Sequence, residues 1–275
     1  MYSVNEGRMD TYNGKVVSVL NCKGGVGRTM VVLNLAHALA LSGYKVLVID
    51  NTIGGDLTDC LCRESILGAS LYDVFASGGD DYDVRKAIRS TRYERIDIMP
   101  CVDSSHIGNQ SFLTKLNNGL HKISEAIIDV ASSEYDFTII DNPPGGDVLL
   151  SWTLLVADLV VVPTVCFNSF AQSGIKTLMD ACSRFRRRQG VKCDKFFVLL
   201  NKFDIREGID CEPYNIANSF DCISIFSHVI PLCKKYRRLM NCESVLKSCP
   251  HSGCAVAFRA FAKEFLDVIK SCNGV

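Results

Sequence analysis

The sequence has no apolar run as long as the roughly eighteen residues of a membrane span, and its first residues lack the apolar core of a signal peptide. We therefore expect a cytoplasmic protein that does not act in a membrane. The fourteen cysteines are scattered and no secretory signal is recognisable, so disulfides are not expected; none forms a Cys-x-x-Cys pair, which argues against a paired-cysteine metal site. Thirty basic residues balance thirty acidic ones, so only local basic patches could bind nucleic acid.

The 275 residues are enough for one large α/β domain. Residues 1–13 are polar and are expected to form a loose arm before a single domain over residues 14–275. Apolar β-branched runs alternate with helical patterns, which predicts a mostly parallel twisted sheet with helices on both faces. The predicted strands cover residues 16–20, 44–50, 96–100, 137–141, 159–163, 196–201 and 226–230. The predicted helices cover residues 30–41, 69–77, 82–90, 111–132, 147–156, 169–188, 212–220, 234–246 and 254–271, and residues 51–58 are predicted to form a loop.

The most informative stretch lies between the first predicted strand and the first predicted helix. It reads Lys23, Gly24, Gly25, Val26, Gly27, Arg28, Thr29 and Met30. A glycine-rich turn lets backbone N–H groups surround an anion, and the helix N-terminus adds positive charge. The hydroxyl of Thr29 stands where a P-loop Ser or Thr binds Mg²⁺. The stretch therefore predicts a site for nucleotide phosphates.

Two predicted strands end in carboxylates, Asp50 and Asp141. Ligands of parallel sheets bind beyond the carboxyl ends of the strands, so these two groups are expected near the glycine-rich turn. With Thr29 they form a candidate Mg²⁺ site. A strand-terminal Asp can instead cap a helix, but the glycine-rich turn favours the metal role.

Taken together, Lys23-Gly-Gly-x-Gly, Asp50 and Asp141 resemble the ParA/MinD family of deviant-Walker ATPases, which are P-loop NTPases of the SIMIBI type. The resemblance covers nearly everything between residues 15 and 270. It implies ATP or ADP with Mg²⁺ as ligands, and a homodimer formed around nucleotide in which Lys23 reaches the partner's phosphates. It also implies that Asn201 and Pro231 border the adenine, although either could be a plain turn residue.

The chain departs from this family at two positions. Arg28 replaces the P-loop lysine, and a planar guanidinium is larger than the compact ammonium that binds the β- and γ-phosphates. Thr52 replaces the acid that orients the attacking water in the family, and a hydroxyl is a poor proton acceptor at neutral pH. We therefore expect nucleotide binding with slow or absent hydrolysis, unless Asp56 compensates.

Two basic clusters resemble regions through which ParA-type dimers bind DNA without sequence preference. The first is Arg186, Arg187 and Arg188; the second is Lys234, Lys235, Arg237 and Arg238. Solvated helix ends are the alternative interpretation. The favoured hypothesis is a ParA-like switch in plasmid or chromosome partition that binds DNA and a ParB-like or other adaptor protein. A pseudo-ATPase that only holds nucleotide, and an iron–sulfur carrier or reductase subunit of the same superfamily, are alternatives; the lack of Cys-x-x-Cys argues against the last.

Overall fold

The computed structural model describes residues 14–62, 68–79, 82–101, 110–145, 148–165, 169–189, 193–204, 222–233 and 243–272. The predicted N-terminal arm over residues 1–13 and the predicted helix over 212–220 lie outside these ranges. None of the helices in the described ranges is long and apolar enough to cross a membrane.

The described strands form one sheet in the order β3-β4-β2-β5-β1-β6-β7-β8. All neighbouring pairs are parallel except β3 and β4 at one edge, which confirms the predicted mostly parallel sheet. The strands are β1 (Lys15–Val19), β2 (Val46–Asp50), β3 (Arg89–Ser90), β4 (Ile96–Met99), β5 (Phe137–Asp141), β6 (Leu159–Thr164), β7 (Phe196–Leu200) and β8 (Ile223–Ile225).

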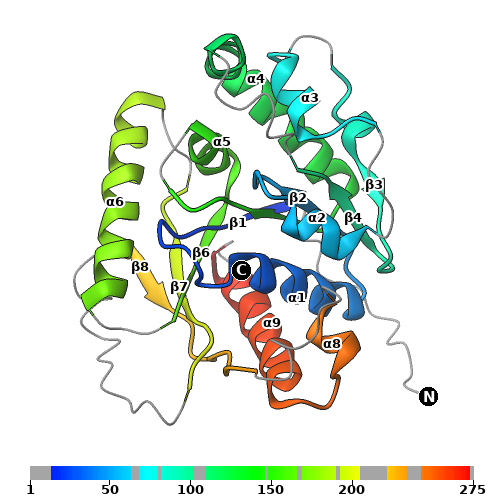
Figure 1. Cartoon of the computed structure of the whole chain (residues 1–275), viewed down its shortest axis with the longest axis vertical. Helices are drawn as coiled ribbons and strands as arrows, with labels where there is room; N and C mark the ends of the chain where they lie inside the picture. The colour runs from blue at the N-terminus through cyan, green and yellow to red at the C-terminus, as the bar shows by residue number, and fades with distance from the viewer. Residues whose placement is uncertain are drawn as a thin grey trace.

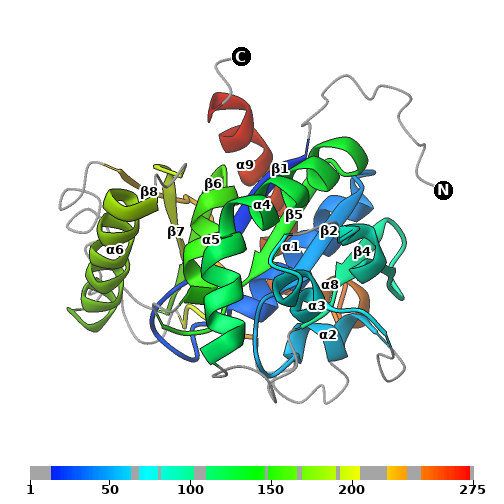
Figure 2. The ribbon, with the colours of Figure 1, turned by 90° about the horizontal axis from the view of Figure 1, so that it is seen from above.

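Helices cover both faces of this sheet (Figures 1 and 2). One face packs against α1 (Arg28–Leu41), α2 (Asp56–Leu61), α8 (Val245–Ser248) and α9 (Gly253–Cys272). The other packs against α3 (Leu71–Ala76), α4 (Gln110–Glu134), α5 (Val148–Val156) and α6 (Ser169–Gln189). Successive strand residues point to opposite faces, so Val46 and Val48 join the first core while Leu47 and Ile49 join the second. Strands buried on both sides explain the near-continuous apolar runs of the sequence.

The loop predicted over residues 51–58 is wrong at its end, because α2 begins at Asp56. The N-cap residue, Gly55, has a φ of 67°. The carboxylate of Asp50 accepts hydrogen bonds from the backbone N–H and the hydroxyl of Thr58, at 2.9 and 2.7 Å. A glycine turn and a contact from another element therefore start this short helix, and neither leaves a hydrophobic repeat in the sequence.

The strand predicted over residues 226–230 is displaced, because β8 ends at Ile225. The backbone N–H groups of Ser227 and His228 donate to the Glu264 carboxylate of α9, at 2.6 and 2.9 Å. These groups are therefore not available to continue the ladder with β7. A carboxylate from a distant helix thus ends the strand that the apolar pattern predicts.

Two predicted helices are also corrected. Within residues 82–90, a short 3-10 helix η1 (Val84–Ala87) gives way to β3, whose residues pair with the edge of β4. Of the helix predicted over residues 234–246, positions 234–242 lie outside the described residues. For the described residues the prediction is wrong at its end, because helix α8 begins only at Val245 and continues to Ser248.

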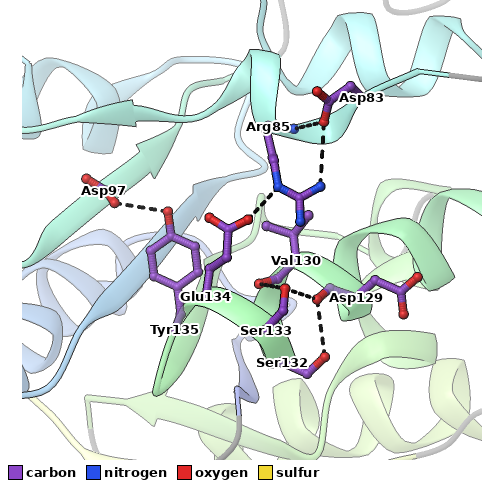
Figure 3. A network of polar contacts seen from close by, with 9 residues as sticks. All are labelled: Asp83, Arg85, Asp97, Asp129, Val130, Ser132, Ser133, Glu134 and Tyr135. Atoms are coloured by element: carbon purple, nitrogen blue, oxygen red, sulfur yellow. Dashed lines mark hydrogen bonds and ion pairs between the residues drawn. The ribbon is translucent and has the colours of Figure 1, made fainter.

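The end of α4 is joined to its neighbours by polar contacts (Figure 3). Arg85 of η1 donates to Glu134 at 2.5 Å, and the hydroxyl of Tyr135 donates to Asp97 of β4 at 2.9 Å. Burial and the charge of Asp97 raise the pKa of Tyr135 above its ordinary value. Tyr135 precedes β5, so this network lies away from the carboxyl ends of the strands and has a structural role.

A buried polar network joins α1 to α8. Asn34 accepts hydrogen bonds from the Ser244 hydroxyl at 2.9 Å and from the Val245 N–H at 2.8 Å. The Ser244 hydroxyl is 2.8 Å from Nδ1 of His37. Because that hydroxyl proton goes to Asn34, Nδ1 of His37 is the donor in this contact, which assigns the tautomer of the neutral ring. Burial, together with the positive charges of Lys247 and Arg259, lowers the pKa of His37 to about 4.

We expect the contribution of His37 to stability to fall as the pH drops below about 6.5, because His37 takes up a proton in the unfolded chain but not in the folded one until about pH 4. Between about pH 7 and about pH 5 this group should remove about 2 kcal/mol from the free energy of unfolding. The measurement is urea unfolding at both pH values in metal-free buffer, for the wild type and for His37→Asn, whose amide nitrogen can replace Nδ1 as a donor.

The raised pKa of Asp141 has the opposite effect over the same range, but it is present in both proteins and cancels in the comparison. From about pH 7 to about pH 5, the change in the free energy of unfolding should therefore be about 2 kcal/mol more unfavourable in the wild type than in His37→Asn. Equal changes in the two proteins would contradict the assignment of the effect to His37.

Candidate functional site

The glycine-rich turn connects β1 to α1, as predicted. Gly25 and Gly27 have φ angles of 76° and 87°, in the left-handed region that favours glycine. At Gly27 space is limited too, since a Cβ there would lie 2.6 Å from Nδ2 of Asn201. A Cβ at Gly24 would meet no atom within 4 Å. Conformation therefore requires glycine at two of the three positions, and packing requires it at one.

Among the described residues, no side chain caps α1 and no acidic residue stands in its first turn. The first turn of a helix has N–H groups without intrahelical acceptors, and the helix dipole is positive there. Thr29 is half-buried in that turn, and Met30 packs partly buried against the core. The N-terminus of α1 thus has the features of an anion site.

Arg28 is directed back onto its own loop. Its NH1 nitrogen donates to the carbonyl oxygens of Asn21 and Lys23, each at 2.7 Å. Burial lowers the pKa of this guanidinium, and the nearby carboxylate of Asp141 opposes that effect. Arginine therefore fits inside the turn, bound to the carbonyls of the residues that lead into it.

The side chain of Lys23 lies on the exposed rim of the turn. Its backbone N–H donates to Oδ1 of Asn21 at 2.9 Å, and Nδ2 of Asn21 donates to the carbonyl of Pro163 at 2.8 Å. Helix α6 approaches closely here, since a Cβ at Gly174 would lie 3.3 Å from Oδ1 of Asn21. Asn21 thus connects the start of the turn to β6, a role that the sequence pattern did not reveal.

The loop after β2 closes around Asp50. In addition to the two hydrogen bonds from Thr58, its carboxylate accepts the backbone N–H and the hydroxyl of Thr52, at 3.0 and 2.6 Å. Burial raises the pKa of Asp50, and these four hydrogen bonds oppose the increase. The Thr52 hydroxyl thus donates its proton to Asp50. Asp56, the residue that could compensate for Thr52, is exposed at the start of α2.

Asp141 ends β5 directly beside Asp50, its partner in the parallel register of β2 and β5. It is completely buried, and neither carboxylate oxygen has a hydrogen-bond partner at normal distance among the described residues. Burial and the charge of Asp50 raise its pKa, the Thr29 hydroxyl and Arg28 oppose the increase, and the net pKa is about 8. Buried carboxylates without partners are costly, and a bound cation would remove that cost. Asp141, Asp50 and Thr29 therefore fit a hard cation such as Mg²⁺.

A second set of buried residues, missed from the sequence, connects the loops after β2 and β5. Nδ2 of Asn51 donates to Oδ1 of Asn142 at 3.0 Å and to the carbonyl of Leu149 at 2.7 Å. The indole of Trp152 donates to Oδ1 of Asn51 at 3.2 Å. Both asparagines directly follow the strand-terminal carboxylates, which is the one signal that pointed to them. Helix α5 is thereby coupled to the residue next to Asp50.

The loop after β7 also reaches the glycine-rich turn. Nδ2 of Asn201 donates to the carbonyl of Val26 at 2.8 Å, and Nζ of Lys202 donates to the carbonyl of Gly25 at 2.7 Å. Pro231 pairs with Phe203 in an isolated parallel bridge. Asn201 and Pro231 thus lie on one connected edge of the site.

The basic clusters are not placed with the other predicted residues. The backbone of Arg186, Arg187 and Arg188 belongs to the last turns of α6, but their side chains lie outside the described part of the chain. The same holds for all of Lys234, Lys235, Arg237 and Arg238.

A strand, a glycine-rich turn, a helix N-terminus and two strand-terminal carboxylates at one edge of a parallel sheet define a P-loop NTPase architecture. A family model described as an AAA domain matches residues 14–194. The chain belongs to this family, that of the ParA/MinD/Soj-type P-loop ATPases.

Individual relatives support this assignment. The chain is 26% identical over 219 residues to the sporulation initiation inhibitor protein Soj of Bacillus subtilis, covering 79% of this chain and 84% of that protein. It is 24% identical over 259 residues to the chromosome partitioning protein ParA of Myxococcus xanthus, covering 92% and 88%. The septum site-determining protein MinD of Pyrococcus horikoshii, solved in complex with Mg-ADP, is similar with a TM-score of 0.70 and 25% identity, covering 91% of this chain and 95% of that one.

Proposed function

We propose that this protein is a ParA-like nucleotide switch that binds ATP with Mg²⁺, dimerises around the nucleotide and acts in plasmid or chromosome partition. The observation that carries the proposal is the buried Asp141 carboxylate, which has no hydrogen-bond partner at normal distance among the described residues and lies beside the glycine-rich turn and Thr29. Such a carboxylate calls for a cation, and the turn with the α1 N-terminus calls for an anion. A magnesium-bound nucleotide supplies both.

In this proposal each element of the site has one role. The N–H groups of residues 24–29 bind the phosphates, with Arg28 as the cation inside the loop. Asp141, Asp50 and Thr29 hold Mg²⁺, which neutralises phosphate charge when it is bound. Asn201 and the backbone at Pro231 border the base. Lys23 stands on the exposed rim, which suits contact with the nucleotide of a second subunit.

We propose that hydrolysis is slow, because Thr52 leaves the loop after β2 without the acid that the family uses. The hydroxyl of Thr52 donates a hydrogen bond to Asp50 at 2.6 Å. This hydrogen bond does not make the hydroxyl oxygen basic enough to take a proton from the attacking water. The same observation favours a second candidate function. The protein could be a pseudo-ATPase that holds nucleotide as a regulatory or structural module and never releases phosphate.

The partners are proposed from the relatives and from the sequence. Two relatives carry names that refer to Soj and to chromosome partitioning, and a MinD relative has been solved in complex with MinC. We propose that this chain likewise forms a homodimer and meets a ParB-like or other adaptor protein. The clusters at 186–188 and 234–238 are proposed to bind DNA phosphates without sequence preference.

Binding and hydrolysis can be measured on the same sample. Trp152 is the only tryptophan of the chain, and its indole contacts Asn51 beside the metal-site residue Asp50, so its fluorescence should change on addition of MgATP. Single-turnover phosphate release is then followed with and without non-specific DNA. Tight binding with slow, DNA-stimulated release would support the partition switch. Binding without release would support the pseudo-ATPase, and no binding of MgATP would contradict the proposal as a whole.

A further inference from the structure

Lys202 has an unusual backbone conformation. Its φ is 56°, and among the described residues only Arg95 is another non-glycine residue with a positive φ. L side chains adopt this region at a cost in free energy, and such conformations persist where the surrounding structure requires them. The turn follows directly from β7, with the Lys202 N–H donating to Oδ1 of Asn201 at 3.0 Å. The surrounding structure therefore holds the backbone of Lys202 in this conformation, which also sets the direction in which its side chain leaves the backbone.

The side chain of Lys202 crosses the glycine-rich turn. A Cβ added at Gly27 would lie 3.2 Å from Cε of Lys202, and the ammonium group of Lys202 donates to the carbonyl of Gly25 at 2.7 Å. The neighbouring Asn201 donates to the next carbonyl, that of Val26, at 2.8 Å. The side chains of Asn201 and Lys202 thus bind the carbonyl oxygens of two successive peptide groups of the turn.

A bound carbonyl also fixes the direction of an N–H group. The peptide unit is planar and trans, so the carbonyl of one residue and the N–H of the next point in opposite directions. Holding the Gly25 oxygen fixes the N–H of Val26, and holding the Val26 oxygen fixes the N–H of Gly27. Both N–H groups are then directed away from the loop after β7. Without these contacts, a flexible glycine-rich turn would lose conformational entropy when an anion binds, and this loss would weaken the binding.

We propose that Lys202 is a positioning residue for the phosphate site, acting through the carbonyl of Gly25 on the N–H of Val26, with Asn201 as its companion on Val26. This inference rests on the proposed nucleotide binding. It assigns to the loop after β7 a role in ordering the glycine-rich turn, in addition to any contact with the base. An ammonium group suits this role because a charged donor forms a stronger hydrogen bond to a carbonyl than a neutral donor does.

The test compares Lys202→Met, which keeps the unbranched stem and removes the donor, with the wild type. The probes are MgATP and inorganic tripolyphosphate with Mg²⁺, which carries phosphates but no base. Losing a charge-assisted hydrogen bond that orders the loop should weaken both probes by about tenfold. Lys202→Arg, which keeps a charged donor, should recover most of the affinity for both.

The matched control is Lys195→Met. The ammonium group of Lys195 also donates to a backbone carbonyl, that of Cys272, at 2.9 Å. This contact joins the residue before β7 to the end of α9 and does not involve the glycine-rich turn. This variant should bind both probes like the wild type. If Lys202→Met weakens MgATP but not tripolyphosphate, Lys202 contacts the base and the inference is wrong; unchanged binding of both probes overturns it as well. Failure of the wild type to bind MgATP would instead contradict the proposed function.

Discussion

The double variant Arg28→Lys, Thr52→Asp should release phosphate from bound ATP at least about 100 times faster than the wild type in a single turnover, because a positioned proton acceptor typically contributes a factor of 10² to 10⁴. In the wild type the Thr52 hydroxyl donates to Asp50 and supplies no base. Lysine at position 28 restores the compact charge that can follow the γ-phosphate, whereas the guanidinium of Arg28 is bound to the carbonyls of Asn21 and Lys23.

The single variants and one isosteric control separate the two effects. Thr52→Asp alone should account for most of the gain, and Arg28→Lys alone should mainly change MgATP affinity. Thr52→Asn has nearly the size of Thr52→Asp but cannot accept a proton, so it should remain as slow as the wild type. All variants are compared with MgATP bound, because a carboxylate at position 52 would repel Asp50 in the metal-free protein. Equal rates for Thr52→Asp and Thr52→Asn would refute this account of the slow step.

Lys23→Ala should lose the nucleotide-dependent dimer while each monomer still binds MgATP. The Lys23 side chain is exposed on the rim of the turn, and the cation inside the turn is Arg28, so the monomer site should change little. Truncating one partner of a buried charged pair at an interface typically costs 2 to 5 kcal/mol, which is a weakening of the dimer by at least about 30-fold. Sedimentation of the protein with and without MgATP measures the dimer fraction.

The control for this experiment is Lys263→Ala, an exposed lysine on α9, which is not part of the glycine-rich turn. It should dimerise like the wild type. Unchanged dimerisation of Lys23→Ala, or loss of MgATP binding by the Lys23→Ala monomer, would show that Lys23 does not act across a subunit interface.

The sequence predicted the sheet and the helices of the regular layers well, because their signals are local. Strands buried on both faces read as continuous apolar runs, and α4 and α9 carry apolar residues at helical spacing. Two of the errors occur where a side-chain carboxylate binds backbone N–H groups. Glu264 ends β8 by accepting two N–H groups, and Asp50 starts α2 by accepting the Thr58 N–H. The hydrophobic pattern of the sequence reports neither of these hydrogen-bonded contacts.

For the site, the sequence by itself determined the glycine-rich turn, the two strand-terminal carboxylates and the two departures at positions 28 and 52. Glycine is needed where φ is positive, and a carboxylate ending a buried strand must lie at the ligand-binding edge of a parallel sheet. Only the tertiary structure decided the direction of Arg28 and the donation from Thr52 to Asp50. It alone also revealed the contact of Lys202 with Gly25. Side-chain direction depends on which acceptors the folded chain brings within hydrogen-bond distance, and the sequence does not contain that information locally.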